Sequence, residues 1–388
     1  MTKFLGPEGF GDFRFIITIL TVFTTIFTFG FYQASARLIV LSNDERCIRE
    51  HYGASILITV ILYFLIIISL SLFFVLDTNI HEKNLFQYLY IVIIFGWVFL
   101  VRNHLEATLQ ASSNIGLLAV SRAFQPLLLL FIIVPLFYFG YFNFSNENVK
   151  YALIFNFISF LLVYLFILKR LNLSFKSIKT RLSDLFSMNK EFGFNVYIGG
   201  VFPLVVASLS ELLISYTSTD NIGVGYYSIA VSLCSLISIF PRIIGSVAYK
   251  RFSTLDKISK NIILAAIGLG LTSLLFLLII IKPFVMFFYG EDFITVISLC
   301  YILSVGVLFH GMGDLINKYL GANGFGSSLR NSAISVGLVL LLLNLILIPK
   351  FQEYGAVTAA SISGFFYCGM MYYYYKKSLK NENKGVTK

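Results

Sequence analysis

Long apolar runs recur along the chain, and each is about long enough to cross a membrane. A spanning helix needs about 20 predominantly apolar residues to cross about 30 Å of hydrocarbon. Such runs lie at roughly 13–41, 52–76, 85–101, 116–142, 151–168, 193–216, 224–249, 262–281, 293–316, 331–348 and 355–375. Continuous runs such as 56–75 lack the period-two alternation of a barrel strand, so internally bonded helices are favoured. The pattern predicts an all-α polytopic membrane protein with about 11 transmembrane helices.

The composition supports this fold class. The 388 residues are 58% hydrophobic and only 12% charged, whereas soluble domains average about 25% charged residues. This excludes an ordinary soluble enzyme, a disordered protein and a secreted disulfide scaffold. The four cysteines and four histidines are too scattered for a metal site, so no metal or cofactor is expected.

The basic residues alternate between connections. Most of the 29 Lys and Arg residues lie in every second connection, and the intervening ones hold only Lys3, Arg14, Lys83, Lys150, Lys282 and Lys350. The positive-inside rule then predicts a cytoplasmic C-terminus and an outer N-terminus. The net charge of +10 reflects this placement, so no nucleic-acid partner is expected.

The longest polar stretch divides the spans into two groups. We expect an N-terminal lobe of five spans at 1–168, a basic cytoplasmic linker at 169–192 and a C-terminal lobe of six spans at 193–388. The linker has apolar residues at helical spacing, which predicts an amphipathic helix at the lipid surface. Matches at a steady offset, such as Arg37 with Arg251, indicate two parallel repeats forming pseudo-symmetric bundles.

Three arginines lie just inside the cytoplasmic ends of predicted spans, namely Arg37, Arg122 and Arg242, and Arg102 is a fourth, shallower candidate. Ionisable groups in spans are costly and usually face a cavity or a partner. Because a guanidinium presents a planar fork of donors that suits phosphate oxygens, these residues are candidates for binding a phosphate-bearing headgroup. The alternative is that their side chains extend to the lipid headgroups. Pro241, which can kink the helix, strengthens the case for Arg242.

Acidic residues in the spans are few. Glu211 lies near the outer end of its helix, whereas His310, Asp314 and Lys318 share one helix face at spacings of four residues. A proton- or cation-coupled step requires such a carboxylate, so Glu211, Asp314 and Lys318 are candidates for ion coupling. The alternatives are a local Asp314–Lys318 ion pair and an ordinary helix–helix hydrogen bond from Glu211.

Several segments together carry a family resemblance. They are LGPEGFGDF at 5–13, GVGYYSIAVSL at 223–233, FPRIIGSVAYKRFS at 240–253, YGEDF at 289–293, LGANG at 320–324 and NLILIPKFQEYGAVTAASIS at 344–363. In this order and spacing they resemble Wzx-type polysaccharide (O-antigen) flippases, in the polysaccharide-transport branch of the multidrug/oligosaccharidyl-lipid/polysaccharide (MOP) superfamily. That family has one helix more, in two equal lobes around a central cavity. The resemblance therefore implies that this chain lacks the family's first transmembrane helix.

The resemblance implies a transporter rather than an enzyme. Its expected substrate is an undecaprenyl-pyrophosphate-linked oligosaccharide, moved by alternating access from the cytoplasmic to the outer leaflet of the bacterial inner membrane. The product would serve O-antigen, capsule or exopolysaccharide synthesis, with membrane lipids and the polysaccharide polymerase machinery as partners. Two alternatives remain open: a multidrug or cation exporter of the same superfamily, and a membrane glycosyltransferase acting as a polymerase or ligase.

Overall fold

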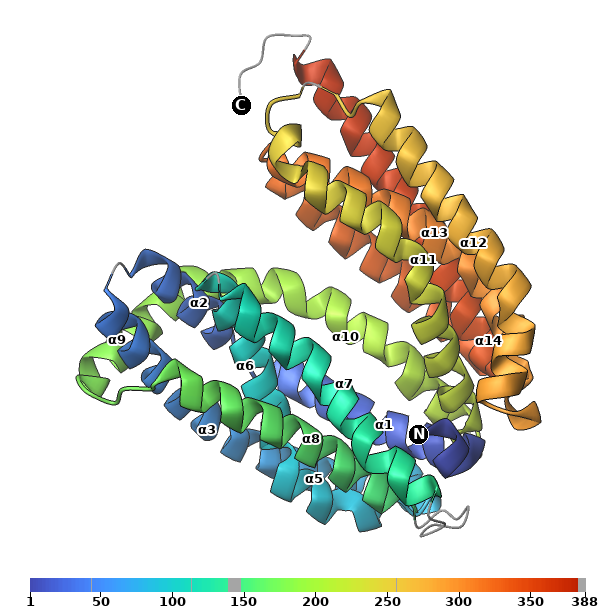
Figure 1. Ribbon diagram of the computed structural model, residues 1–388, viewed down its shortest axis with the longest axis horizontal. Coiled ribbons are helices and arrows are strands. Elements are labelled where there is room, and N and C mark those ends of the chain that lie inside the picture. Colours follow the sequence, from blue (N-terminus) through green and yellow to red (C-terminus); the bar gives the residue numbers. More distant parts are fainter. Residues whose placement is uncertain (43, 113, 139–147, 256, 383–388) are drawn as a thin grey trace. The chain divides into compact units, whose positions relative to one another are not determined.

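The protein is built from helices that divide into two compact units. The computed structural model describes residues 1–42, 44–112, 114–138, 148–255 and 257–382, and every regular element in these ranges is helical. Unit 1 is Met1–Ser208 and unit 2 is Leu209–Lys388 (Figure 1). The all-α prediction is confirmed. The expected lobe boundaries at 168 and 193 stay a prediction.

Unit 1 contains the elements from the N-terminus into α10. They are α1 (Thr2–Ile26), α2 (Phe31–Leu41), α3 (Glu45–Leu76), α4 (Thr78–Glu82), η1 (Leu85–Tyr88), α5 (Leu89–Phe95), α6 (Trp97–Ala111), α7 (Ile115–Tyr138), α8 (Asn148–Leu171), α9 (Ile178–Met188), η2 (Asn189–Gly193) and most of α10 (Phe194–Thr217). The predicted run at 13–41 is two helices rather than one. The break occurs at Gly30, whose φ of 85° suits glycine and whose backbone lies so close to Gly193 that a Cβ would come within 2.5 Å.

Unit 2 contains fewer but longer helices. After the end of α10 these are α11 (Ile222–Phe252), α12 (Lys260–Phe288), η3 (Glu291–Phe293), α13 (Thr295–Ala322) and α14 (Gly326–Glu382). The last is two helical arms, because Gln352 has non-helical angles (φ 49°, ψ −126°). A Cβ on Gly355 would lie 2.3 Å from the Leu347 carbonyl oxygen, so the arms fold back tightly at this point.

The helices are long and apolar enough for a multi-pass membrane protein. Among the described residues nine helices could cross a membrane, or ten if the pair Leu85–Phe95 and Trp97–Ala111, bent by 49°, is one span. The segment Gly326–Leu379 has 54 residues, which is about 80 Å of helix. This is more than twice the hydrocarbon thickness of about 30 Å. Its two arms correspond to the last two predicted spans.

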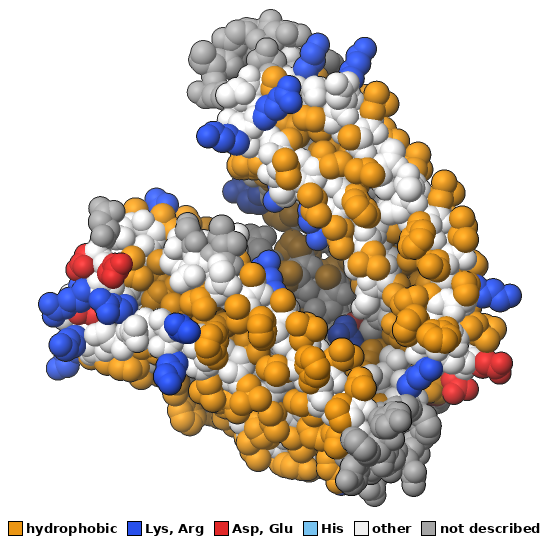
Figure 2. All heavy atoms as spheres, in the orientation of Figure 1, with side chains coloured by type: hydrophobic (Ala, Val, Ile, Leu, Met, Phe, Trp, Pro, Cys, Tyr) orange, Lys and Arg blue, Asp and Glu red, His pale blue; other side chains and the backbone are white. Residues whose placement is uncertain are grey.

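Helix α3 shows how these sequences divide between packing and lipid. Its buried residues recur every fourth position, at Ile58, Leu62, Ile66, Leu70 and Phe74. Over this same stretch, most of the other side chains are also apolar, and many of them are exposed. A helix that is hydrophobic on all sides but packs along one stripe is typical of a membrane span. Figure 2 shows hydrophobic side chains over most of the visible face of each unit.

The polar segment between the two groups of predicted spans is part of unit 1 and packs against its other helices. Helix α9 lies within it and contacts α2 and α3. Arg181 Nε donates to Glu50 Oε2 at 3.0 Å, and Arg46 Nε donates to Glu50 Oε1 at 3.2 Å. The Glu50 side chain is almost fully buried. The expected helix is therefore present and packs on α2 and α3, while its place at the lipid surface stays a prediction.

Candidate functional site

Two of the four candidate arginines meet in one polar pocket of unit 1. Arg102 from α6 and Arg122 from α7 line a cavity of about 390 Å³ together with Glu106, Ser121, Gln125 and Phe160. Arg102 Nε donates to Glu106 Oε1 at 3.1 Å, and Arg122 Nη2 lies 3.7 Å from Glu106 Oε2. Each carboxylate oxygen of Glu106 thus faces one guanidinium group.

Helix α8 borders the pocket through Phe160. Gln125 Nε2 on α7 donates to Asn156 Oδ1 at 3.3 Å and to Ser159 Oγ at 3.0 Å, which ties α7 to α8. The Arg102 guanidinium carbon lies 5.2 Å from the centroid of the Phe160 ring, within the range of a cation–π contact. Both arginines keep accessible donors, because their side chains are 39% and 60% exposed.

The third candidate, Arg242, belongs to a polar cluster inside unit 2. Arg242 Nε on α11 donates to Asp314 Oδ2 on α13 at 3.0 Å. The Tyr367 hydroxyl on α14 donates to Asp314 Oδ1 at 3.2 Å. His310 Nδ1 lies 3.8 Å from Asp314 Oδ2, and the His310 and Tyr367 rings are 4.5 Å apart. Asp314 therefore joins three helices.

Small residues on α13 bring these helices together. A Cβ on Gly311 would lie 2.9 Å from the Ser238 Cα on α11, and a Cβ on Gly313 would lie 2.6 Å from the Tyr367 ring. Without those side chains, α11 and Tyr367 approach the α13 backbone closely, as at many membrane helix contacts. The turn that carries Asp314 is consequently within reach of both Arg242 and Tyr367.

In the described part of the chain, the ion pairs of Asp314 do not include Lys318, the partner considered as the alternative to ion coupling. Among the described residues Asp314 pairs with Arg242 and His310, whereas the Lys318 stem packs beside Gly245 of α11. Arg242 on α11 lies within hydrogen-bond distance of Asp314 and takes the place that Lys318, one turn further along α13, could have filled. Lys318 nevertheless lies on the face of α13 that meets α11.

The remaining candidates, Arg37 and Glu211, have other contacts within their own units. The Arg37 guanidinium carbon lies 5.6 Å from the centroid of the Phe192 ring, within unit 1. Glu211 is buried and accepts a hydrogen bond from Ser228 Oγ at 3.0 Å. The helix–helix hydrogen bond that was the simpler interpretation of Glu211 is therefore present, joining α10 to α11.

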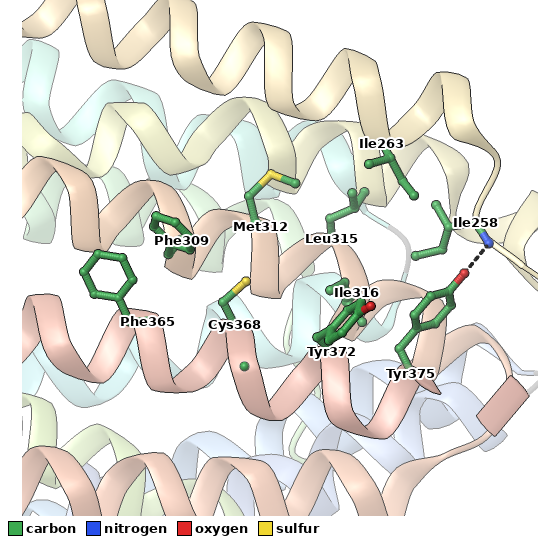
Figure 3. Close-up of a pocket in the computed structure, with 11 residues that line it drawn as sticks. Ile258, Ile263, Phe309, Met312, Leu315, Ile316, Phe365, Cys368, Tyr372 and Tyr375 are labelled. Carbon is green, nitrogen blue, oxygen red and sulfur yellow. Dashed lines mark hydrogen bonds between the residues drawn. The ribbon is translucent and has the colours of Figure 1, made fainter. Parts of the chain in front are cut away.

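A second kind of cavity occurs in unit 2. It has a volume of about 440 Å³, and its lining from α12, α13, α14 and the preceding connection contains no charged residue. Figure 3 shows Phe309, Met312 and Phe365 pointing into it beside Cys368. Such a lining suits hydrocarbon and offers nothing for a charged headgroup.

Sequence comparison assigns the chain to a family. Residues 1–256 match the profile described as "Polysaccharide biosynthesis protein", which is more than half of the 388 residues. No curated protein matches the chain in sequence.

Solved structures share the fold at low identity. An inward-facing MATE-family multidrug resistance transporter of the MOP superfamily matches with a TM-score of 0.75 and 14% identity, over 98% of this chain and 93% of that chain. The lipid II flippase MurJ, in an inward closed conformation, matches with a TM-score of 0.71 and 14% identity, over 97% of this chain and 84% of that chain. The MATE multidrug transporter DinF-BH in complex with R6G matches with a TM-score of 0.67 and 17% identity, over 97% of this chain and 89% of that chain. These likenesses show a two-lobe MOP-type fold.

Proposed function

The chain belongs to the polysaccharide biosynthesis protein family, and on that premise we propose that it is a flippase for lipid-linked oligosaccharide. The proposed substrate is an undecaprenyl-pyrophosphate-linked oligosaccharide. It is carried by alternating access from the cytoplasmic to the outer leaflet of the bacterial inner membrane, with the C-terminus of the protein in the cytoplasm. The product feeds O-antigen, capsule or exopolysaccharide synthesis.

The observation that carries the proposal is the polar pocket of Arg102 and Arg122 among membrane-spanning helices. A pyrophosphate-linked sugar is too polar to cross hydrocarbon unaided, since moving a charge out of water without a partner is very costly. Half-exposed guanidinium groups supply the charge and the donors that lower this cost. In the proposed transporter Arg37 and Arg242 are further contacts for the headgroup.

Ion coupling is assigned to the acidic candidates. Asp314 lies against Arg242, so a change in its protonation alters the charge beside a proposed substrate contact. Glu211 and Lys318 are the other residues of the proposed coupling path. An ion-coupled step requires a carboxylate within the spans, where such groups are otherwise costly.

A basic pocket also separates this function from export of cationic drugs. Two of the similar structures are multidrug transporters, and cationic compounds are poor ligands for the Arg102 and Arg122 pocket. Like charges in a site raise the free energy of binding.

Deletion of the gene in its host tests the proposal. We expect loss of surface polysaccharide and accumulation of undecaprenyl-pyrophosphate-linked oligosaccharide in extracted lipids. Wild-type protein and Arg330→Gln, an exposed control with the same charge change, should restore both. Arg102→Gln and Arg122→Gln at equal membrane levels should not. Normal polysaccharide combined with a gain in drug sensitivity would contradict the proposal and favour a drug exporter.

A further inference from the structure

The pocket in unit 1 contains more positive than negative charge. Arg102 and Arg122 share the single carboxylate of Glu106, and the other residues that line the cavity are uncharged. One positive charge is therefore uncompensated within the pocket. Uncompensated charge among apolar helices is unfavourable unless water or an anion reaches it, so the pocket is suited to an anion.

The contacts leave one edge of the Arg102 guanidinium available. Its Nε–H is occupied by Glu106, and one face lies over the Phe160 ring. No acidic partner other than Glu106 contacts Arg102 or Arg122 in the described part of the chain. The Nη donors of Arg102 therefore remain for a ligand. Two guanidinium forks on opposite sides of one small anion match the oxygens of a phosphate group.

A buried hydroxyl beside the pocket also lacks a partner. Tyr164 lies one turn after Phe160 on α8, with the two rings stacked at 5.9 Å. Its hydroxyl forms no hydrogen bond with the described residues, and it lies within electrostatic range of Arg102 and Glu106. Buried hydroxyl groups are normally paired, so this hydroxyl is a further donor close to the pocket.

We propose that Glu106 is a positioning residue and exchangeable counter-ion for a phosphate group that binds between Arg102 and Arg122. The inference rests on the proposed function and names the phosphate next to the polyprenyl chain as the ligand. Without ligand, Glu106 holds both guanidinium groups in place. When phosphate enters, it displaces the carboxylate; when phosphate leaves, the carboxylate returns. This exchange limits the affinity for phosphate, so the substrate can be released.

A binding experiment separates this role from a structural one. Wild-type and variant proteins in nanodiscs of zwitterionic lipid are titrated with undecaprenyl pyrophosphate. We expect Arg102→Gln and Arg122→Gln to weaken binding about tenfold or more, the effect of losing about 1.4 kcal/mol. Glu106→Gln should tighten binding several-fold and slow dissociation, because it removes the competing charge. Glu106→Asp, which restores that charge, should bind as the wild type does.

The control is Glu45→Gln, an exposed residue of unit 1 with the same charge change, which should leave the affinity unchanged. A structural role for Glu106 predicts the opposite sign, since losing it would misplace both arginines and weaken binding. Weaker binding by a folded Glu106→Gln protein overturns the proposal, and so does wild-type binding by both arginine variants.

A competition experiment distinguishes the phosphate of undecaprenyl pyrophosphate from the phosphate of an ordinary phospholipid headgroup. Phosphatidylglycerol should compete poorly with undecaprenyl pyrophosphate. If it competes equally, the pocket is a phospholipid site and the inference is wrong about its ligand. If binding follows the expected pattern but deletion of the gene leaves lipid-linked oligosaccharide unchanged, the phosphate site stands and the proposed transport function fails.

Discussion

Packing around Gly313, rather than the Arg242–Asp314 ion pair, should hold the polar cluster of unit 2 together. In Gly313→Ala the new Cβ would lie 2.6 and 2.7 Å from two atoms of the Tyr367 ring, whereas ordinary contacts are 3.4–4 Å. The ring must then move by about 1 Å, and such overpacking costs about 1–3 kcal/mol. Asp314→Asn keeps the side-chain size and an acceptor for Tyr367. Because Arg242 is 53% exposed, the lost ion pair costs at most about 1 kcal/mol.

Thermal and denaturant unfolding in one detergent, combined with hydrogen exchange over α13 and α14, measures this difference. Gly369→Ala on α14 is the matched control, because its Cβ would meet nothing within 4 Å. The control should be neutral or slightly stabilised, since alanine favours helix over glycine. The Gly369→Ala control should be the most stable of the three variants, Asp314→Asn should be less stable, and Gly313→Ala should be the least stable. A Gly313→Ala protein as stable as Asp314→Asn would refute the packing argument.

Three further outcomes follow from single contacts. Arg181→Gln should increase hydrogen exchange across α9, because the buried Glu50 loses its donor from that helix; unchanged exchange would show that apolar packing alone docks it. Ser55→Ala should lower stability by about 1–3 kcal/mol, since His104 loses its 2.7 Å partner; an unchanged melting temperature would contradict this. Arg37→Lys should reduce transport, because a lysine cannot hold a phosphate group bidentately as an arginine does. Full transport activity would show that the Arg37 side chain only extends to the membrane lipid headgroups.

The sequence predicted the spans well because hydropathy is local. Each span is a continuous run of about 20 apolar residues, so it can be recognised from its own sequence without knowing which helices pack against it. The breaks were harder to place. Apolar residues around Gly30 continue the run at 13–41, and nothing local shows that Gly193 packs there. Gln352 has a positive φ that its residue type does not favour, although Pro349 nearby is a helix-breaking signal.

Only part of the candidate site could be predicted from the sequence. The four-residue spacing of Arg102 and Glu106 already indicates a pair on one helix face, and Glu106 could have been found that way. Tyr367 could not, because it lies 53 positions from Asp314 and meets it only through the packing of α14 on α13. Arg242 as the partner of Asp314 was missed for the same reason, since spacing along one helix says nothing about donors on another helix.

Translocation in proteoliposomes tests whether phosphate recognition by arginine underlies transport. A fluorescent oligosaccharide is placed on a polyprenyl pyrophosphate or on a phosphate-free polyprenyl lipid, and a membrane-impermeant quencher reports its leaflet. The wild type should translocate only the pyrophosphate-linked lipid, and Arg102→Gln and Arg122→Gln should reduce that rate about tenfold or more. Equal translocation of both lipids, or undiminished rates in both arginine variants, would contradict the account.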